Sequence, residues 1–552
     1  MQFAMIKLTG TSYNANEKIW SGPITKNLYS GDMTVGEAIV IQLLKTPNKV
    51  IQIVDSTGET LTAQEFVEHS MTLAKSMLEL GIKCKNVVGY YARHSIHLAT
   101  VILASCLCGT SVSGLYAEFD KDTIINIYGK TRPSIIFCDK FNFEKAHHAN
   151  AQLNLNAKLV LMTGSLEGVA TINDLLTTKH QSMRLSEFPC TNLKSSDTAV
   201  ILCSSGTTGS PKGSMGSHET LLHSNCYATA TIDSVLLSFS TMYWASGLLN
   251  LFSSLLNSTL RIVPDKPYSP EYFLYLVKRY QVTHVFVNCT QMAELVLKFS
   301  KEELKEGFES IDTILCGGSK VPQTIQEKCL DAFSTDKLRP GFCIGYGMSE
   351  IVGILSYNGG YPHEFKPQTE GKLWTNRQVC IVDENYQRLG PNETGELMVY
   401  NSHTWLGYYN DPATTAKVMD GQWLHTGDMG YFDDSGFLHL MGRNKDMFKW
   451  KGFQICPQPI EDVLLRLTGV AEVCVFPKPD LVAGNLASCA IVRTKDNAGE
   501  ALTADMVHAF LNSNLDSFFG MKGGVHFVES IPKTSTGKMQ RNQVLAMICE
   551  EI

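Results

Sequence analysis

The run Ser204-Ser205-Gly206-Thr207-Thr208-Gly209-Ser210-Pro211-Lys212-Gly213 is the most informative stretch of this chain. It follows an apolar segment of strand character at 199–203 and combines hydroxyl groups, glycines and one ammonium group. Because glycines let backbone N–H groups approach a ligand closely, such a loop suits a polyphosphate. It is not a Walker A loop, since Pro211 before Lys212 disfavours a helix there. A flexible Ser/Gly-rich linker is the alternative interpretation.

Composition and charge restrict the class of protein. The 552 residues are 44% hydrophobic and 18% charged, as in globular proteins, and several packed domains are expected. A formal net charge of -7 with scattered basic residues argues against nucleic acid as a partner. The 16 cysteines show no metal-ligand spacing, which favours reduced, buried thiols. The most apolar stretch, 101–116, is too short to span a membrane and is expected to be a buried helix followed by a strand.

Apolar segments of strand character alternate with amphipathic helical patterns, which predicts a doubly wound α/β fold. A capping box of Thr62 and Glu65 predicts the start of a helix, and Gly81 predicts its end. A charged turn around 444–445 indicates a domain boundary, after which a small α+β unit with strands at 471–475 and 487–492 is expected. Further buried strands are expected at 51–54, 87–90, 134–137 and 159–162.

Further motifs follow the Ser/Thr/Gly loop in a fixed order. They are Gly345-Tyr346-Gly347-Met348-Ser349-Glu350, Thr426-Gly427-Asp428, Gly442-Arg443-Asn444-Lys445-Asp446 and Pro532-Lys533-Thr534-Ser535-Thr536-Gly537-Lys538. With these motifs the chain resembles, over nearly its whole length, the adenylate-forming superfamily of acyl-CoA synthetases, 4-coumarate–CoA ligases, beetle luciferases and peptide-synthetase adenylation domains. The resemblance implies a large N-terminal AMP-binding (adenylation) domain, 1–443, of doubly wound sheets with a β-barrel-like part. It also implies a small, mobile α+β C-terminal lid domain, 444–552.

The resemblance also implies a reaction in which a carboxylic acid attacks the α-phosphate of ATP, and the thiolate of coenzyme A then displaces AMP. Because the transition state is polyanionic, positioned cations and N–H donors are expected to dominate catalysis. ATP, Mg²⁺ and coenzyme A are therefore the expected cofactors and co-substrates. The implied phosphate clamp is Ser204, Ser205, Gly206, Thr207, Thr208, Gly209 and Lys212. The implied binding residues around the adenosine and α-phosphate are Gly317, Gly318, Ser319, Gly345, Tyr346, Gly347, Ser349, Asp428 and Arg443.

The resemblance assigns catalytic roles to a smaller set. Lys538 is expected to bridge the substrate carboxylate and the α-phosphate, and Glu350 is expected to hold Mg²⁺. Lys449 and Gln454 match ligase residues of the second half-reaction, reached after the lid rotates about Lys445. Peptide-synthetase adenylation domains usually differ in that segment.

The acyl pocket is expected to include Trp244, Gly247 and Asn288. Trp244 occupies the position of a histidine found in many relatives and would gate the acyl tunnel, with a core role as the alternative. The segment 287–289 replaces a proline-bearing turn of many relatives.

The expected function is an ATP-dependent carboxylic acid–CoA ligase acting on medium- or long-chain fatty acids. Oxidation of an adenylate, as in luciferase, is an alternative, although 222–224 and 351–354 depart from the luciferase pattern. A 4-coumarate-type aryl acid ligase and a catalytically dead fatty-acid-binding protein are also compatible with the sequence. The expected partners are a small carboxylic acid and coenzyme A. The cytoplasm is the expected compartment and the peroxisome the alternative, although no Ser-Lys-Leu-type signal stands at the C-terminus.

Overall fold

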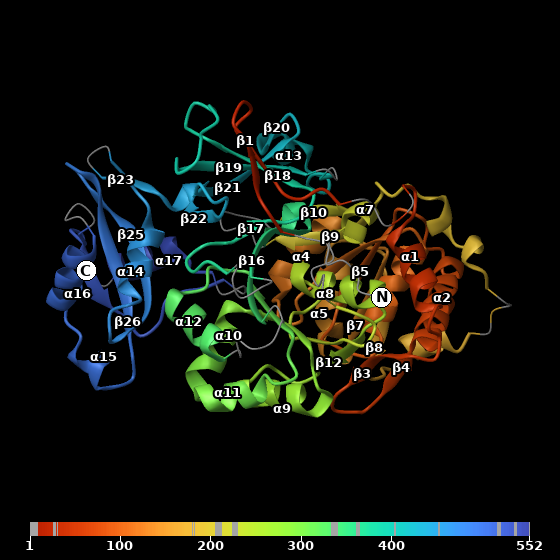
Figure 1. Cartoon of the computed structure of the whole chain (residues 1–552). Helices are drawn as coiled ribbons and strands as arrows, with labels where there is room; N and C mark the ends of the chain where they lie inside the picture. The colour runs from red at the N-terminus through yellow and green to blue at the C-terminus, as the bar shows by residue number, and fades with distance from the viewer. Residues whose placement is uncertain are drawn as a thin grey trace, which may run out of the picture.

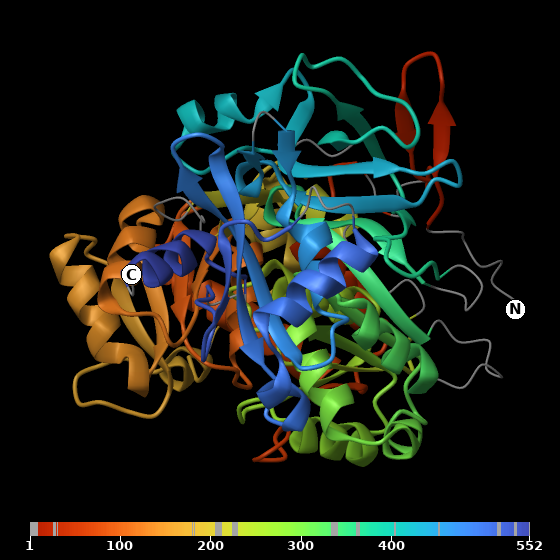
Figure 2. The same ribbon diagram turned by 90° about the vertical axis from the view of Figure 1, so that its left-hand side faces the viewer.

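The computed structural model describes residues 9–25, 29, 31–178, 180, 183–204, 212–223, 230–332, 341–359, 365–401, 405–450, 453–515, 520–534 and 538–550. Its described strands form four sheets. Three of them belong to the larger N-terminal part, and the fourth forms the smaller C-terminal unit, drawn in blue in Figure 1. Figure 2 shows this C-terminal unit in front of the rest of the chain. The expected large and small parts are therefore both present.

The first sheet contains the strands that flank the Ser/Thr/Gly loop. Its order is β10 (Lys212–Ser217), β9 (Thr198–Ser204), β6 (Ser111–Leu115), β5 (Val87–Tyr91), β7 (Ile135–Asp139) and β8 (Lys158–Thr163). Its strands run parallel except β10, which is antiparallel to β9. Strands β5, β6 and β7 are buried throughout because helices cover both faces. These helices are α2 (Ala63–Glu79) and α3 (Leu98–Leu107) on one face, and α4 (Lys121–Thr131) and α5 (Phe143–Gln152) on the other.

The second sheet brings several predicted site segments to one edge. Its order is β17 (Lys372–Leu373), β16 (Gly353–Asn358), β15 (Gly341–Met348), β14 (Thr313–Gly317), β13 (His284–Asn288), β11 (Val235–Ser238), β12 (Leu260–Val263), β3 (Val50–Val54) and β4 (Thr60–Thr62). The strands from β15 to β3 in this order are parallel. Their carboxyl ends therefore meet at one edge, where ligands bind in open α/β sheets.

Helices also cover both faces of this second sheet. One face packs against α9 (Pro270–Tyr280), α10 (Cys289–Lys298) and α12 (Gln323–Ala332), with α11 (Lys301–Gly307) beside them. The other face packs against α8 (Ala245–Leu256), which joins α1 (Val35–Leu43), α2 and α3 in one core. The two sheets thus share a helical layer, and the predicted doubly wound architecture is confirmed. Two short helices, α6 (Ile172–Leu176) and α7 (His218–His223), follow β8 and β10.

The third sheet is antiparallel and carries the Thr426-Gly427-Asp428 motif. Its order is β1 (Ser12–Asn14), β2 (Ile19–Ser21), β18 (Arg377–Val382), β19 (Gly395–Asn401), β21 (Trp423–Phe432) and β20 (Met419–Asp420), with β22 (Leu438–Arg443) also paired to β21. Strand β21 alternates strictly between half-buried and buried residues, as one covered face requires. The short helix α13 (Pro412–Lys417) precedes β20.

The fourth sheet forms the C-terminal unit. Its order is β24 (Phe453–Ile455), β23 (Phe448–Trp450), β26 (Gly484–Arg493) and β25 (Val470–Asp480), and β27 (Gly524–Phe527) pairs with β26. Helices α14 (Pro457–Leu464) and α16 (Ala504–Asn514) pack on one face, and α17 (Arg541–Glu550) packs on the other. The short helix α15 (Asn497–Ala501) follows β26. The chain leaves the third sheet at Arg443 and enters the fourth at Phe448, while the boundary at 443/444 stays a prediction.

Candidate active site

The Ser/Thr/Gly loop connects two directly paired strand ends. Ser204 is the last residue of β9, Lys212 is the first residue of β10, and the two residues face each other in the antiparallel register. Ser205, Gly206, Thr207, Thr208 and Gly209 lie outside the described residues, and so does the side chain of Ser204. Their expected contacts with phosphate stay a prediction.

Lys212 and Glu350 are joined through one aromatic residue. The Lys212 ammonium lies 5.1 Å from the centre of the Tyr408 ring. The Tyr408 hydroxyl donates to Glu350 Oε1 at 2.8 Å, and burial together with this carboxylate raises the pKa of Tyr408. Beside them, Ser214 Oγ on β10 donates to the carbonyl oxygen of Ser349 at 3.1 Å. The expected phosphate-binding lysine and the expected Mg²⁺ ligand therefore lie at one place.

Asp428 forms a compact corner with Tyr346 and Arg443. It faces Arg443 across the β21–β22 pair, and Arg443 Nε lies 2.7 Å from Asp428 Oδ1. The Tyr346 hydroxyl donates to Asp428 Oδ2 at 2.5 Å, and burial and this carboxylate hold the pKa of Tyr346 well above its ordinary value. A carboxylate has about four lone-pair positions. Asp428 thus keeps the capacity to accept from the two hydroxyls of a ribose.

The glycines at the ends of β14 and β15 keep this edge of the second sheet thin. Gly317 is paired with Gly345, and a Cβ atom on Gly317 would lie 2.7 Å from the Gly345 oxygen. Gly347 is as restricted, since its Cβ atom would lie 2.1 Å from the Gly353 oxygen. Gly318 has a φ of +97° and is exposed together with Ser319. This conformation suits glycine, and it opens a surface on which a flat group can lie.

Lys538, a residue of the C-terminal unit, lies near the charged residues described above. Burial and the cations Arg443 and Lys445 lower the pKa of Lys538, while the carboxylates Asp428 and Glu350 oppose the shift. The residue is still exposed to solvent, so these neighbours act on it without sealing it from water. Its backbone N–H donates to Thr534 Oγ1 at 3.1 Å.

We call Lys212, Glu350, Asp428, Arg443, Lys445 and Lys538 the charged cluster. Lys445 lies in the turn Asn444–Asp446, and burial lowers its pKa, with Arg443 and Lys212 acting in the same direction and the carboxylates Asp446 and Asp428 opposing the shift. The four cations and two carboxylates give the cluster a formal charge of +2 before any ligand binds. An excess of fixed positive charge in a partly enclosed site favours a polyphosphate.

The other predicted residues of the lid lie elsewhere. Lys449 and Gln454 face each other on β23 and β24, and Lys449 is exposed. Figure 1 shows β23 at the upper outer edge of the C-terminal unit. The side chain of Gln454 lies outside the described part of the chain. The arrangement therefore brings Lys538, rather than the Lys449–Gln454 hairpin, to the charged cluster.

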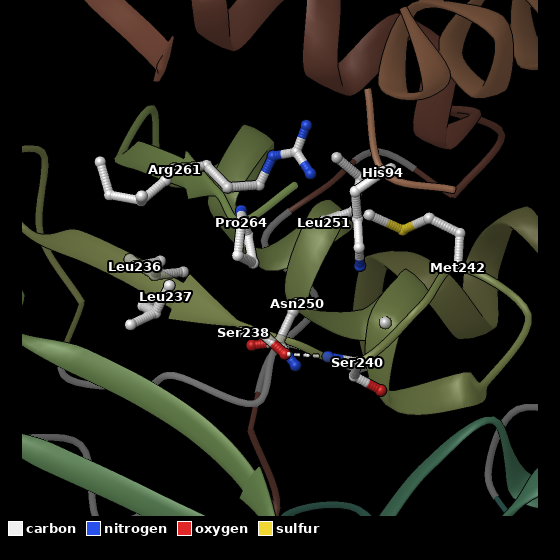
Figure 3. A pocket seen from close by; sticks show the side chains of 12 residues that line it. His94, Leu236, Leu237, Ser238, Ser240, Met242, Asn250, Leu251, Arg261 and Pro264 are labelled. Atoms are coloured by element: carbon white, nitrogen blue, oxygen red, sulfur yellow. Dashed lines mark hydrogen bonds between the residues drawn. The ribbon is translucent and has the colours of Figure 1, made fainter. Parts of the chain in front are cut away.

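A small cavity lies where β11 and β12 end beneath α8 (Figure 3). It includes the predicted Gly247, whose Cβ atom would lie 2.1 Å from the Thr241 oxygen. Trp244 and Asn288 are not among the described residues that line it. Trp244 instead packs edge-on against Tyr243, with ring centres 4.4 Å apart, and the side chain of Asn288 caps α10.

The sequence predictions missed six polar or adaptable residues of this cavity: His94, Ser238, Ser240, Met242, Asn250 and Arg261. Two of them had a detectable signal, because Met242 lies two residues before Trp244, and Asn250 lies three residues after Gly247 on a largely apolar helix. His94 and Arg261 come from segments far from every motif, and only the fold brings them together.

The sequence also predicted that Glu350 holds Mg²⁺. The described residues contain no group of three or more His, Cys, Asp or Glu side chains suited to hold a metal ion. A single carboxylate fits Mg²⁺ that binds mainly through phosphate oxygens and water, as this ion does in nucleotide sites. In the described part of the chain, no helix is long and apolar enough to cross a membrane.

Comparison with known proteins agrees with this geometry. The AMP-binding enzyme family matches residues 41–409, and the AMP-binding enzyme C-terminal domain matches residues 459–538. The luciferin 4-monooxygenase of Photuris pensylvanica is 26% identical over 512 residues, covering 89% of this chain and 90% of that protein. The 4-coumarate–CoA ligase 1 of Petroselinum crispum is 26% identical over 522 residues, covering 91% and 92%. The peroxisomal OPC-8:0-CoA ligase 1 of Arabidopsis thaliana is 26% identical over 497 residues, covering 89% of each.

Solved structures show the same fold at lower identity. The anthranilate CoA ligase AuaEII in complex with anthranoyl-AMP superimposes with a TM-score of 0.82 at 17% identity, covering 95% of this chain and 99% of that chain. ATP-bound MatB from Rhodopseudomonas palustris gives a TM-score of 0.80 at 22% identity, covering 93% and 99%. The expected resemblance is confirmed: the chain is an enzyme of the AMP-binding family, with the family's C-terminal domain following its main domain.

Proposed function

We propose that the protein is an ATP-dependent carboxylic acid–CoA ligase that forms an acyl-AMP intermediate and then acyl-CoA. The observation that carries this proposal is the position of Lys538, which the C-terminal unit presents to Glu350, Asp428 and Arg443. The family match and the CoA ligases among the relatives support it.

In the first half-reaction one bond to the α-phosphorus forms and another breaks. A carboxylate oxygen of the acid bonds to the α-phosphorus, and the bond from that phosphorus to the bridging oxygen of pyrophosphate breaks. Lys538 is the group proposed to stabilise the charge between carboxylate and α-phosphate, and Lys212 the group that holds the leaving pyrophosphate. Asp428 and Arg443 would fix the ribose, and Glu350 would hold Mg²⁺, which supplies charge neutralisation when bound. Such positioning accounts for most of the catalysis expected in phosphoryl and nucleotidyl transfer.

The second half-reaction transfers the acyl group to sulfur. The thiolate of coenzyme A bonds to the acyl carbon, and the bond from that carbon to the AMP oxygen breaks. We propose that residues 444–552 rotate about Lys445 for this step, because Lys538 lies near the other residues of the charged cluster in the present arrangement. The rotation would bring Lys449 and Gln454 to the site in its place.

The acid is proposed to be aliphatic and of medium or greater length. The cavity beneath α8 supports this, since half of the residues that line it are apolar, namely Leu236, Leu237, Met242, Leu251, Ile262 and Pro264. Aryl acids and luciferin remain the competing substrates, because the relatives include a 4-coumarate–CoA ligase and luciferin monooxygenases. The cytoplasm stays the predicted compartment, and one relative is named as peroxisomal.

A substrate screen tests the proposal. The protein is incubated with ATP, Mg²⁺ and one acid from a fatty, cinnamic or short-chain set, with and without coenzyme A. We expect pyrophosphate release with aliphatic acids, and AMP with acyl-CoA only when coenzyme A is present. Light from luciferin and oxygen without thioester formation would favour adenylate oxidation. Absence of pyrophosphate release with every acid would favour a protein that binds acids without catalysis.

A further inference from the structure

We propose that the cavity beneath α8 binds a second carboxylate at the far end of the substrate acid, so that the protein activates α,ω-dicarboxylic acids. The inference rests on the proposed ligase function and specifies its substrate class. It is drawn from Arg261, which is the charged residue among the described residues that line the cavity.

Arg261 has a neutral partner where a guanidinium usually has a carboxylate. Its Nη2 donates to Oε1 of Gln52, and Gln52 is 2% exposed and donates from Nε2 to the Ile96 oxygen at 2.9 Å. The amide is therefore held so that its oxygen faces Arg261. Burial lowers the pKa of Arg261 to about 10, and the group stays charged at neutral pH. A guanidinium offers five N–H donors in a planar fork that matches a carboxylate.

The groups around Arg261 also suit an oxyanion. Figure 3 shows Arg261 and His94 at the same end of the cavity and the Ser238–Ser240 pair at the other. His94 Nε2 is buried and has no partner among the described residues, and burial and Arg261 lower the pKa of His94 to about 4. The Asp265 carboxylate raises the pKa of His94, but Asp265 does not line the cavity. A bound carboxylate would counter the Arg261 charge and raise the pKa of His94, and Nε2 of the protonated ring would then donate to it.

The position of the cavity suits the far end of an aliphatic acid. Strands β14, β13, β11 and β12 are consecutive neighbours, and all four are parallel. Because neighbouring strands lie about 4.8 Å apart, β12 lies roughly 14 Å from β14, where Gly317–Ser319 begin. The apolar residues of the cavity would contact the methylene groups next to the far carboxylate. An acid with an apolar middle and two carboxylates matches both ends, one at the charged cluster and one at Arg261.

Direct binding and turnover are measured separately. Straight-chain diacids from butanedioate to dodecanedioate, and the monoacids of equal length, are titrated into the protein by calorimetry and tested for pyrophosphate release. The variants are Arg261→Met, which keeps the stem and removes the charge, and Arg261→Lys, which keeps the charge. Arg388→Met is the control, because Arg388 lies between β18 and β19, over the Trp423 ring. Thermal unfolding establishes that each variant is folded.

We expect one length of diacid to bind the wild type more tightly than its monoacid. In Arg261→Met the affinity for this diacid and its kcat/KM should fall about 10- to 100-fold, with the monoacid changed less than about threefold. Arg261→Lys should retain part of the preference, and Arg388→Met all of it. Equal losses for both acid classes, or no diacid preference in the wild type, would overturn the inference. Arg261-dependent diacid binding without pyrophosphate release would uphold the carboxylate site at Arg261 and contradict the ligase function instead.

Discussion

The ion pair between Lys320 and Asp462 is expected to hold the C-terminal unit in the arrangement that adenylation needs. Lys320 directly follows Ser319 in the larger part, Asp462 lies on α14, and their charged atoms are 2.6 Å apart. Gln458 Nε2 donates to the second Asp462 oxygen at 3.1 Å, and the side chains of Lys320 and Asp462 are 25% and 35% exposed. The perturbation is Asp462→Asn, which keeps the shape and removes the charge.

The size of the effect follows from this partial exposure. A pair screened by solvent contributes up to about 1 kcal/mol, and the charge-assisted hydrogen bond at short distance places this pair at the upper end of that range. Loss of the charge should then shift the equilibrium between docked and undocked units about fivefold. The adenylation rate is proportional to the docked fraction. It therefore falls by at most this factor, and by less where most molecules stay docked.

The assay separates the two half-reactions. Pyrophosphate release from acid and ATP should fall by up to about fivefold in Asp462→Asn, and thioester formation from supplied acyl-AMP should stay the same or rise. Asp331→Asn is the matched control, because its 2.8 Å pair with Lys301 lies within the larger part. An equal loss in both half-reactions, or a loss of the same size in the control, would refute the argument that this pair acts through docking.

Three further perturbations address the hinge, the pocket and a buried acid. Lys445→Pro fixes φ at this residue and removes an N–H donor, so it should prevent the rotation. Pyrophosphate release should survive while acyl-CoA formation falls sharply. Equal effects on both half-reactions would contradict a rotation at Lys445. Trp244→Ala should change the ranking of acids by length or width if Trp244 gates the pocket, whereas an unchanged ranking with a lower melting temperature would make it a core residue. Burial raises the pKa of Glu370 to about 7, so the folded chain binds a proton there that the unfolded chain releases near pH 4.5. Stability should therefore decrease between about pH 4.5 and pH 7 by a few kcal/mol, and Glu370→Gln should flatten this part of the melting-temperature profile.

Much of the fold was predictable because local signals and tertiary structure agree. The capping box of Thr62 and Glu65 starts α2 with both of its hydrogen bonds, and the expected strand at 199–203 is β9. The apolar stretch 101–116 contains α3 followed by β6, as expected. In the C-terminal unit the expected strands 471–475 and 487–492 lie within the longer β25 and β26. Apolar residues indicate the buried middle of a strand. The polar ends of β25 and β26 have strand structure only because the two strands pair with each other.

The candidate site was likewise predictable where its residues belong to local motifs, and not where only the fold brings residues together. Lys212, Glu350, Asp428, Arg443 and Lys538 belong to motifs with fixed order, and the fold gathers them at one place. The Tyr346–Asp428 hydrogen bond joins residues 82 positions apart, and no local pattern indicates it. The cavity escaped prediction for the same reason, because Arg261 lies on a short strand whose pattern shows only a charged residue among apolar ones.

Lys538 offers the most direct test, because it is the residue of the C-terminal unit that is proposed to act on the reacting groups in adenylation. Lys538→Met is compared with the wild type and with Lys495→Met, a substitution at an exposed lysine of the same unit. Single-turnover pyrophosphate release should fall about 10²- to 10³-fold in Lys538→Met, the usual cost of one transition-state charge contact. Thioester formation from supplied acyl-AMP should stay within about threefold of the wild type, and Lys495→Met should resemble the wild type in both. If Lys538→Met left pyrophosphate release intact, or lowered both half-reactions equally, the proposed role of Lys538 would be contradicted.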